Sequence, residues 1–152
     1  MLTLDVMAWD GYEFPQNTLS RAHPGDAGLD ICALRDTTLL SERVTLVPTG
    51  LTVAIPKGYF GLLTLRSGWA CDLNCFMPNG VGIIDSGYRG EIKVPVYHMN
   101  YMAIYLHAGE RFAQLTIIPF ANVAVTFHTT PVTWPDVKAT ERGTGGFGSS
   151  GR

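Results

Sequence analysis

The sequence predicts an all-β fold, and three observations support this prediction. Short segments rich in β-branched, aromatic and leucine residues recur along most of the chain, and turn-forming residues separate them at close intervals. Only residues 68–74 form a fair candidate for a helix, and that segment is short. Short strands punctuated by turns at this spacing are typical of a β-sandwich or a β-barrel.

Residues that favour a turn interrupt the expected strands. The turns are expected at Pro48–Gly50, Pro56–Gly58, Asn79-Gly80, Ser86-Gly87 and Ala108-Gly109. The strands are expected at Leu2–Met7, Val44–Val47, Leu51–Ile55, Tyr59–Leu65, Glu91–His98, Ala103–Leu106, Phe112–Ile118 and Val123–Phe127. The loop that starts at His23 is expected to become a strand by Ile31. We find no internal repeat and no linker, so one domain is expected.

The composition narrows the classes of function. The chain has 152 residues, 46% hydrophobic and 16% charged, which is typical of a globular protein. A formal net charge of −2 gives no basic field, so we expect no stable nucleic-acid binding. No apolar run approaches the roughly 20 residues of a membrane span, and Met1–Asp5 does not resemble a secretory signal. We therefore expect a cytoplasmic protein, in the host cytoplasm if the source is viral, with reduced thiols at Cys32, Cys71 and Cys75.

The last ten residues before the terminal arginine form a glycine-rich segment. Five of the ten residues in Arg142–Gly151 are glycine, which disfavours a stable helix or strand. A mobile tail is one interpretation. The segment also carries an arginine, an aromatic ring and two hydroxyls, so a lid that orders on a phosphate ligand is the other interpretation.

The segment Val81–Val94 has the composition of a tight β-hairpin, in which two apolar strands flank Ser86-Gly87. Asp85 and Tyr88 would then face each other across the turn. A carboxylate there can orient and deprotonate a water, and the ring can serve as a floor for a sugar. A turn-capping aspartate and a cross-strand aromatic residue are the structural alternative.

Other polar segments could hold a phosphate. Arg66, Ser67 and the following backbone amides lie where a strand is expected to end, an arrangement that suits an anion. A surface ion pair and a helix cap are the alternatives there. Asp26 and Asp30 could support a hydrated Mg²⁺ or be plain loop residues. Gln114 could donate to phosphate oxygens or simply be an exposed strand residue.

Five of these segments, in this order, resemble the five motifs of the trimeric dUTP pyrophosphatases (dUTPases). The matching segments are Asp26–Asp30, Arg66–Ala70, Gly82–Glu91, Gly109–Leu115 and Arg142–Gly151. Single short motifs match often by chance, whereas five in order over nearly the whole chain do not. Trp69 departs from the smaller aliphatic residue common in the family, and Cys71 and Cys75 have no family role.

The resemblance implies a distorted jelly-roll (β-clip-like) protomer over residues 1–130, followed by a flexible C-terminal arm over residues 131–152. It also implies a homotrimer whose active sites are shared among subunits, with the arm crossing to a neighbour. The implied activity is hydrolysis of dUTP to dUMP and pyrophosphate. That reaction limits uracil in DNA and supplies dUMP for dTMP synthesis.

The resemblance also implies a role for each site residue. Asp85 would activate the water that attacks the α-phosphorus, and Asp30 would support the hydration shell of Mg²⁺ without binding the metal directly. The expected contacts to the phosphates come from Arg66, Ser67, Gly68, Gln114, Arg142 and Ser149. The expected contacts to the nucleoside come from Asn79, Gly82, Ile84, Tyr88, Phe147 and Gly148.

Two alternatives remain at this point. A dCTP deaminase shares the fold and the class of nucleotide, and ammonia release from dCTP would identify one. A module that binds a regulatory protein partner under nucleotide control is the second alternative, and it is compatible with catalysis. A pull-down with and without a non-hydrolysable dUTP analogue would test the second.

Overall fold

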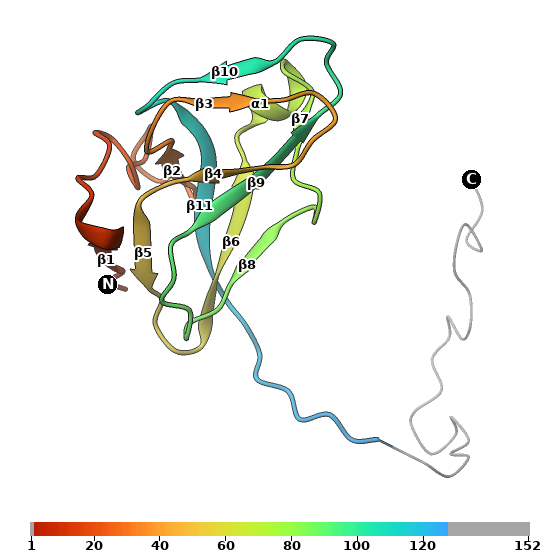
Figure 1. Cartoon of the computed structure of the whole chain (residues 1–152). Coiled ribbons are helices and arrows are strands. Elements are labelled where there is room, and N and C mark those ends of the chain that lie inside the picture. The colour runs from red at the N-terminus through yellow and green to blue at the C-terminus, as the bar shows by residue number, and fades with distance from the viewer. Residues whose placement is uncertain (1, 128–152) are drawn as a thin grey trace. The chain divides into compact units, whose positions relative to one another are not determined.

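Eleven strands, one 3-10 turn and one short α-helix are present in residues 2–127, the part of the chain that this computed structural model describes (Figure 1). The elements are β1 (Asp5–Ala8), η1 (Trp9–Gly11), β2 (Leu29–Cys32), β3 (Thr37–Leu39), β4 (Thr45–Pro48), β5 (Leu51–Ala54), β6 (Tyr59–Leu65), α1 (Ser67–Cys71), β7 (Cys75–Phe76), β8 (Gly82–Ile84), β9 (Lys93–His98), β10 (Ile104–Leu106) and β11 (Arg111–Pro119). The predicted all-β class is therefore confirmed.

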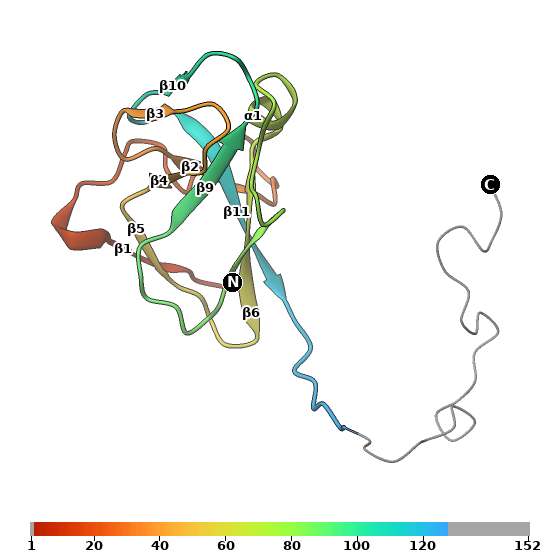
Figure 2. The same ribbon diagram turned by 45° about the vertical axis from the view of Figure 1, so that its right-hand side comes forward.

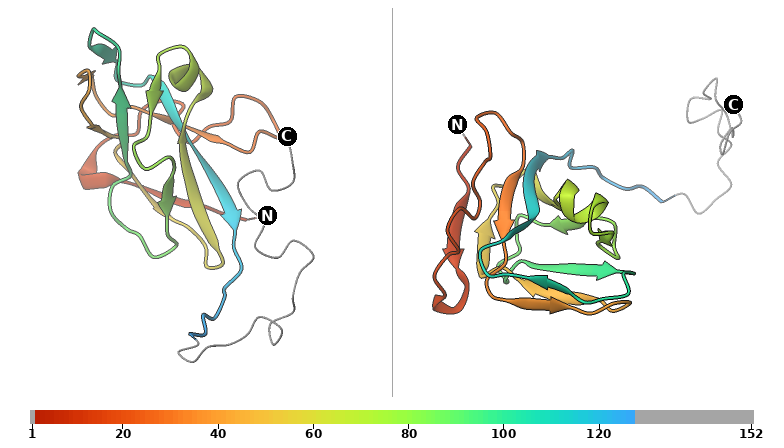
Figure 3. Two further views of the ribbon diagram at one scale, coloured as in Figure 1. Left: turned by 90° about the vertical axis from the view of Figure 1, so that its right-hand side faces the viewer. Right: turned by 90° about the horizontal axis from the view of Figure 1, so that it is seen from above.

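The strands form two main antiparallel sheets and two strand pairs. The larger sheet has the order β2-β11-β6-β8, and the second has the order β4-β9-β7. The pairs are β1-β5 and β3-β10. Strand β9 runs in front of β6 and β11 (Figures 1 and 2), and the side view in Figure 3 separates the two layers.

The core lies between these layers and follows from strand alternation. In β9 the side chains of Val94, Val96 and His98 are buried while their neighbours are more exposed, as a period of two requires. Opposite them lie the buried Leu63 of β6 and Leu115 of β11. Each such aliphatic side chain contributes about 1.5–3 kcal/mol when fully buried.

Most of the predicted strands agree with the structure, because the local sequence determines where these strands form. Strand β6 has the predicted bounds, and most of the others are shifted by one or two residues. The short strands β3 and β7 were not predicted. The strand predicted at Val123–Phe127 is wrong, because residues 121–127 have no regular structure and are exposed. An alternating apolar pattern favours a strand, but a strand needs a partner edge.

The tight hairpin predicted around Ser86-Gly87 is also wrong. The turn itself is present, since the Tyr88 amide donates to the Asp85 carbonyl at 3.0 Å. However, β8 pairs with β6, and β9 pairs with β4 and β7. The flanking strands therefore belong to different sheets, and the turn connects the two layers.

The chain divides into two compact units, Met1–Ala121 and Asn122–Arg152. Most of the second unit, including Arg142, Phe147, Gly148 and Ser149, lies outside the described residues. Within the described part, the only α-helix has five residues, so no helix there has the length and hydrophobicity to span a membrane.

His98, at the end of β9, forms hydrogen bonds with β3 and with the residues that follow β9. Its ring is fully buried, Nε2 lies 3.0 Å from the Leu39 carbonyl, and the Asn100 amide donates to Nδ1 at 3.3 Å. A neutral ring with the proton on Nε2 satisfies both contacts.

We predict that His98→Leu lowers the free energy of unfolding by about 1–3 kcal/mol, because it removes the partner of a buried carbonyl and of an amide. Urea denaturation at fixed protein concentration would measure this loss. The neighbouring Met99→Leu, at a side chain 67% exposed, is the control and is expected to change little. Equal stability of the two variants would contradict the role assigned to His98.

Candidate active site

Three adjacent strands bring the predicted phosphate-binding residues together. Gln114 of β11 lies directly opposite Asp30 of β2 on one side and Thr64 of β6 on the other. Directly opposed residues share a face of the sheet. Arg66 and Ser67 follow β6 at the same end, and all except Thr64 line a cavity of about 310 Å³. The cavity is completed by Ala22, Asp26, Ala27 and Gly28.

Asp30 is the electrostatic centre of this region. The residue is only 6% exposed, and each carboxylate oxygen contacts a guanidinium group. Arg66 Nε lies 3.1 Å from Oδ1, and Arg111 Nη1 lies 3.0 Å from Oδ2. A buried carboxylate needs such partners, because an unpaired charge there would be costly. Asp30 in turn holds both arginines in place, and because it belongs to strand β2, its interpretation as a plain loop residue is wrong.

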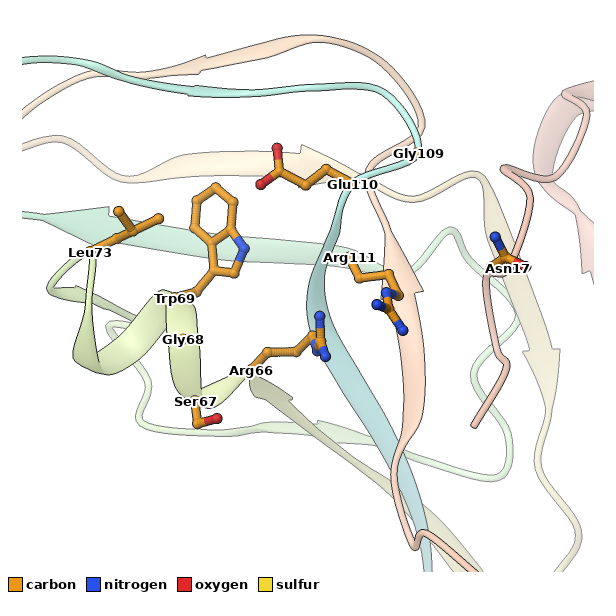
Figure 4. Close-up of a pocket in the computed structure, with 9 residues that line it drawn as sticks. All are labelled: Asn17, Arg66, Ser67, Gly68, Trp69, Leu73, Gly109, Glu110 and Arg111. Carbon is orange, nitrogen blue, oxygen red and sulfur yellow. The ribbon is translucent and has the colours of Figure 1, made fainter. Parts of the chain in front are cut away.

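The two arginines reach Asp30 from different elements. Arg66 leaves the junction of β6 and α1, and Arg111 leaves the start of β11, where a β-bulge at Phe112 shifts the register against β2. Figure 4 shows their guanidinium groups approaching each other. Arg66 contacts Asp30 through Nε, so its two terminal nitrogens are not used in that ion pair. Such an arginine is oriented to bind an anion.

A second cavity of about 530 Å³ lies beside the same junction (Figure 4). Trp69 lines it and packs edge-to-face on Phe112, with ring centroids 6.2 Å apart and an interplanar angle of 75°. The Arg66 amide also donates to the Phe112 carbonyl at 2.9 Å. These two contacts attach the start of α1 to β11. Trp69 is therefore a core residue that anchors α1.

Ser67 does not cap the helix. Arg66 occupies the N-cap position, and Ser67 is the first helical residue and is exposed. The helix-cap interpretation of Ser67 is therefore wrong, and its hydroxyl, like the adjacent exposed Gly68, faces a cavity.

Asp85 and Tyr88 line another cavity, of about 410 Å³. Arg89 Nη1 stabilises their turn by donating to the carbonyls of Ser86 at 2.8 Å and Tyr88 at 2.7 Å. The Tyr88 hydroxyl donates to the Glu91 carbonyl at 2.9 Å, which fixes the ring. Asp85 itself is exposed, so its carboxylate is open to water and to a ligand.

The three residues expected at the base lie on or near β8. Ile84, half-buried, lines the cavity of Asp85. Gly82 is buried opposite Leu63, and a Cβ atom at Gly82 would come within 3.1 Å of that side chain. Asn79 is exposed in the preceding turn, where its carbonyl accepts from the Val81 amide at 2.8 Å. Asn79 does not line the cavity of Asp85.

The two halves of the candidate site lie at opposite ends of β6. Ile84 pairs with Gly61, so Asp85 follows beside Phe60, and Arg66 lies six residues farther along β6. At about 3.3 Å per residue, the separation along the strand is about 20 Å. The Arg66 side chain also extends towards β2, away from β8. Arg66 and Asp85 of one chain therefore lie far apart and line different cavities.

The described residues 2–127 contain no cluster of three His, Cys, Asp or Glu side chains that could hold a metal ion. The two buried thiols are also poor candidates for chemistry. Burial raises the pKa of Cys75 to about 11 and raises the pKa of Cys32 above its usual value. Cys71 is exposed, and all three are free thiols.

Several lining residues were not singled out from the sequence. Arg111 lies within the fourth motif-like segment, Gly109–Leu115, but its ion pair with Asp30 depends on the pairing of β11 with β2. Trp9, Glu91 and Lys93 line the cavity of Asp85, and only the fold brings Trp9 there.

Comparisons with known proteins agree with the resemblance. The family model described as dUTPase matches residues 15–151. The deoxyuridine 5'-triphosphate nucleotidohydrolase of Leifsonia xyli subsp. xyli is 42% identical over 132 residues, covering 86% of this chain and 82% of that relative. The Mycobacterium tuberculosis protein of the same name is 41% identical over 133 residues, covering 87% and 86%.

Solved structures give the same result. A Staphylococcus bacteriophage 80alpha dUTPase mutant with dUpNHpp has a TM-score of 0.77 and 26% identity, with 99% of each chain covered. The Streptococcus mutans dUTPase has a TM-score of 0.73 and 25% identity, covering 79% of this chain and 98% of that one. The chain therefore belongs to the dUTPase family, the deoxyuridine triphosphate nucleotidohydrolases.

Proposed function

We propose that this protein hydrolyses dUTP to dUMP and pyrophosphate in the cytoplasm, or in the host cytoplasm if the source is viral. The observation that carries the proposal is the convergence of Arg66, Ser67 and Gln114 on one cavity beside the buried Asp30. These residues come from distant parts of the chain, and together they provide a cation and neutral donors suited to phosphate oxygens.

The phosphate chain would be held mainly by positioned donors. Arg66, oriented by Asp30, would use its terminal nitrogens, while Ser67, the Gly68 amide and Gln114 would contact neighbouring oxygens. Arg142 and Ser149, outside the described residues, would close on the γ-phosphate. Phosphoryl transfer depends chiefly on such positioning and on charge stabilisation. This division of roles needs no covalent nucleophile.

Mg²⁺ is the proposed cofactor, bound by the phosphate oxygens of the substrate. Both oxygens of Asp30 already contact guanidinium groups, and two adjacent cations disfavour direct binding of a divalent ion there. Asp30 would therefore contact Mg²⁺ only through a water that is bound to the metal. When bound, Mg²⁺ would neutralise part of the triphosphate charge.

Asp85 is the proposed catalytic residue. Its exposed carboxylate, on a turn fixed by Arg89, can accept a hydrogen bond from a water and orient it towards the α-phosphorus. The water oxygen would form a bond to the α-phosphorus as its proton moves to Asp85. The bond from the α-phosphorus to the bridging oxygen of the β-phosphate breaks, and pyrophosphate leaves with that electron pair.

The nucleoside would be selected by shape and by backbone polarity. The ring of Tyr88, held through its hydroxyl, would lie under the deoxyribose and leave no space for a 2′-hydroxyl. Backbone groups of Gly82 and Ile84, with Asn79 nearby, would pair with the uracil edge. A cytosine would then leave buried polar groups unpaired, and this penalty is a stronger basis for rejection than a difference in shape. Phe147 and Gly148 would cover the base.

A homotrimer with shared sites is the proposed assembly. The separation of Arg66 from Asp85 along β6 supports a site that takes these residues from two chains. A second observation points to contact between copies, since Val123, Val125 and Phe127 are 72%, 70% and 85% exposed. Alternate apolar residues of this kind suit a strand that pairs with another chain. The arm would complete the site from a third chain.

We predict that Asp85→Asn lowers kcat by at least about a hundredfold, because an amide cannot accept the proton from water. Pyrophosphate release would measure the rate, and a non-hydrolysable dUTP analogue would show that binding is retained. Asp5→Asn, at another exposed aspartate, is the control. Near-normal turnover of the Asp85 variant would remove this residue from the mechanism.

Shared sites predict complementation between two inactive variants. When Arg66→Gln and Asp85→Asn chains are co-expressed, a site that takes each residue from a different chain is intact in about a quarter of random combinations. We therefore expect about a quarter of the activity of the unaltered protein, measured by pyrophosphate release. Each variant expressed alone is the control. Activity no higher than in these controls would indicate sites formed within single chains.

Gly28→Ala tests the part played by Gln114. A Cβ atom at Gly28 would lie 2.6 Å from Gln114 Oε1 and 3.3 Å from its Cδ, so the amide would have to move. We expect kcat/KM to fall between roughly ten- and a hundredfold with the fold retained. In a Gln114→Ala background the same change should have little further effect. Additive losses in the double variant would disprove this coupling.

A further inference from the structure

Trp9 lies in the cavity of Asp85 and Tyr88, although it comes from the other end of the sequence. The dUTPase family model matches residues 15–151, so Trp9 also lies outside the matched region. None of the five motifs accounts for an aromatic residue at this point of the cavity.

The backbone around Trp9 is fixed on both sides. Strand β1 lies beside β5 (Figure 1), with Ala8 paired to Leu51. The Trp9 amide then donates to the Gly50 carbonyl at 2.8 Å, and the Tyr12 amide donates to the Trp9 carbonyl at 3.1 Å. The next residue, Asp10, has a φ of 52°, a left-handed conformation that reverses the chain. Trp9 is therefore placed by the fold and does not lie in an open tail.

Further hydrogen bonds connect the backbone of Trp9 to Tyr88. Gly50, which binds the Trp9 amide, donates its own amide to Glu91 Oε1 at 3.0 Å. Glu91 in turn accepts from the Tyr88 hydroxyl through its carbonyl at 2.9 Å. A short chain of hydrogen bonds thus sets both aromatic residues around one cavity.

The charges of this cavity favour a neutral ligand portion. Its charged side chains are Asp85, Glu91 and Lys93, and Lys93 Nζ already pairs with Glu91 Oε2 at 3.4 Å. With this lysine paired, the residues that line the cavity offer no further cation to hold a phosphate chain. A sugar and a base are uncharged, the base is flat, and the cavity of about 410 Å³ is within the range for small ligands.

We propose that Trp9 is a wall of the nucleoside half of the site and that its indole contacts the sugar and base of the bound nucleotide. This inference rests on the proposed function. Trp9 is 39% exposed, so a face of the ring is open, and covering it with a nucleoside removes apolar surface from water. Trp9 would then be a specificity-determining residue that acts on binding and not on the chemical step.

The test compares Trp9→Ala with the unaltered protein. Loss of an aromatic contact to a base is expected to raise the KM for dUTP about tenfold. The kcat is expected to stay within about twofold, because the contact would be equal in the ground and transition states. Inhibition by dUMP should weaken in the same ratio as KM, whereas inhibition by pyrophosphate should not change. Trp9→Phe should recover most of the affinity.

Tyr12→Ala is the matched control, because Tyr12 is three residues away, 46% exposed and not part of the cavity. It is expected to leave KM and dUMP inhibition unchanged. Unchanged dUMP inhibition in Trp9→Ala would overturn the inference. An equal weakening of inhibition by dUMP and of inhibition by pyrophosphate would also overturn the inference, since that result indicates general damage to the fold.

These results are separable from failure of the proposed function. If the unaltered protein released no pyrophosphate from dUTP, the proposed function would fall. Direct binding of dUMP to the unaltered protein and to Trp9→Ala, measured by calorimetry, would still decide whether Trp9 contacts the nucleoside.

Discussion

The candidate site depends most on one buried carboxylate. Asp30 is almost fully enclosed, and it is stabilised only because Arg66 and Arg111 contact its two oxygens. The pairing joins β2, the end of β6 and the start of β11 at one point. Without a partner, a charge in this position would cost several kcal/mol. The same interaction therefore stabilises the sheet and orients Arg66, the cation proposed to bind phosphate.

The proposed site accounts for how a member of the dUTPase family with a net charge of only −2 could act on a highly charged substrate. No general basic field is needed when a few cations are held rigidly by a buried acid. However, a single chain carries the proposed phosphate half and the proposed nucleoside half of the site at opposite ends of β6. The length of β6 thus keeps Arg66 and Asp85 of one chain apart. We propose that association of chains brings an Arg66 and an Asp85 from different chains together.

Most elements could be predicted because their side chains alternate over several residues, as in β6 and β9. The errors have a common cause. The turn at Asp85–Tyr88 forms as its composition predicts, but β8 and β9 pair with distant strands instead of each other. Likewise, Val123–Phe127 has the pattern of a strand without a partner in the described chain. Strand pairing depends on contacts between distant residues, which local composition does not contain.

The sequence by itself determined the all-β class and the family, because strand patterns, turn residues and the order of motifs can all be read along the chain. Only the tertiary structure decided what the site residues contact. It paired Asp30 with two arginines, showed that Ser67 is not a helix cap, and brought Trp9 to the cavity of Asp85. Each of these depends on which strands lie side by side, and that arrangement is set by packing of the whole core.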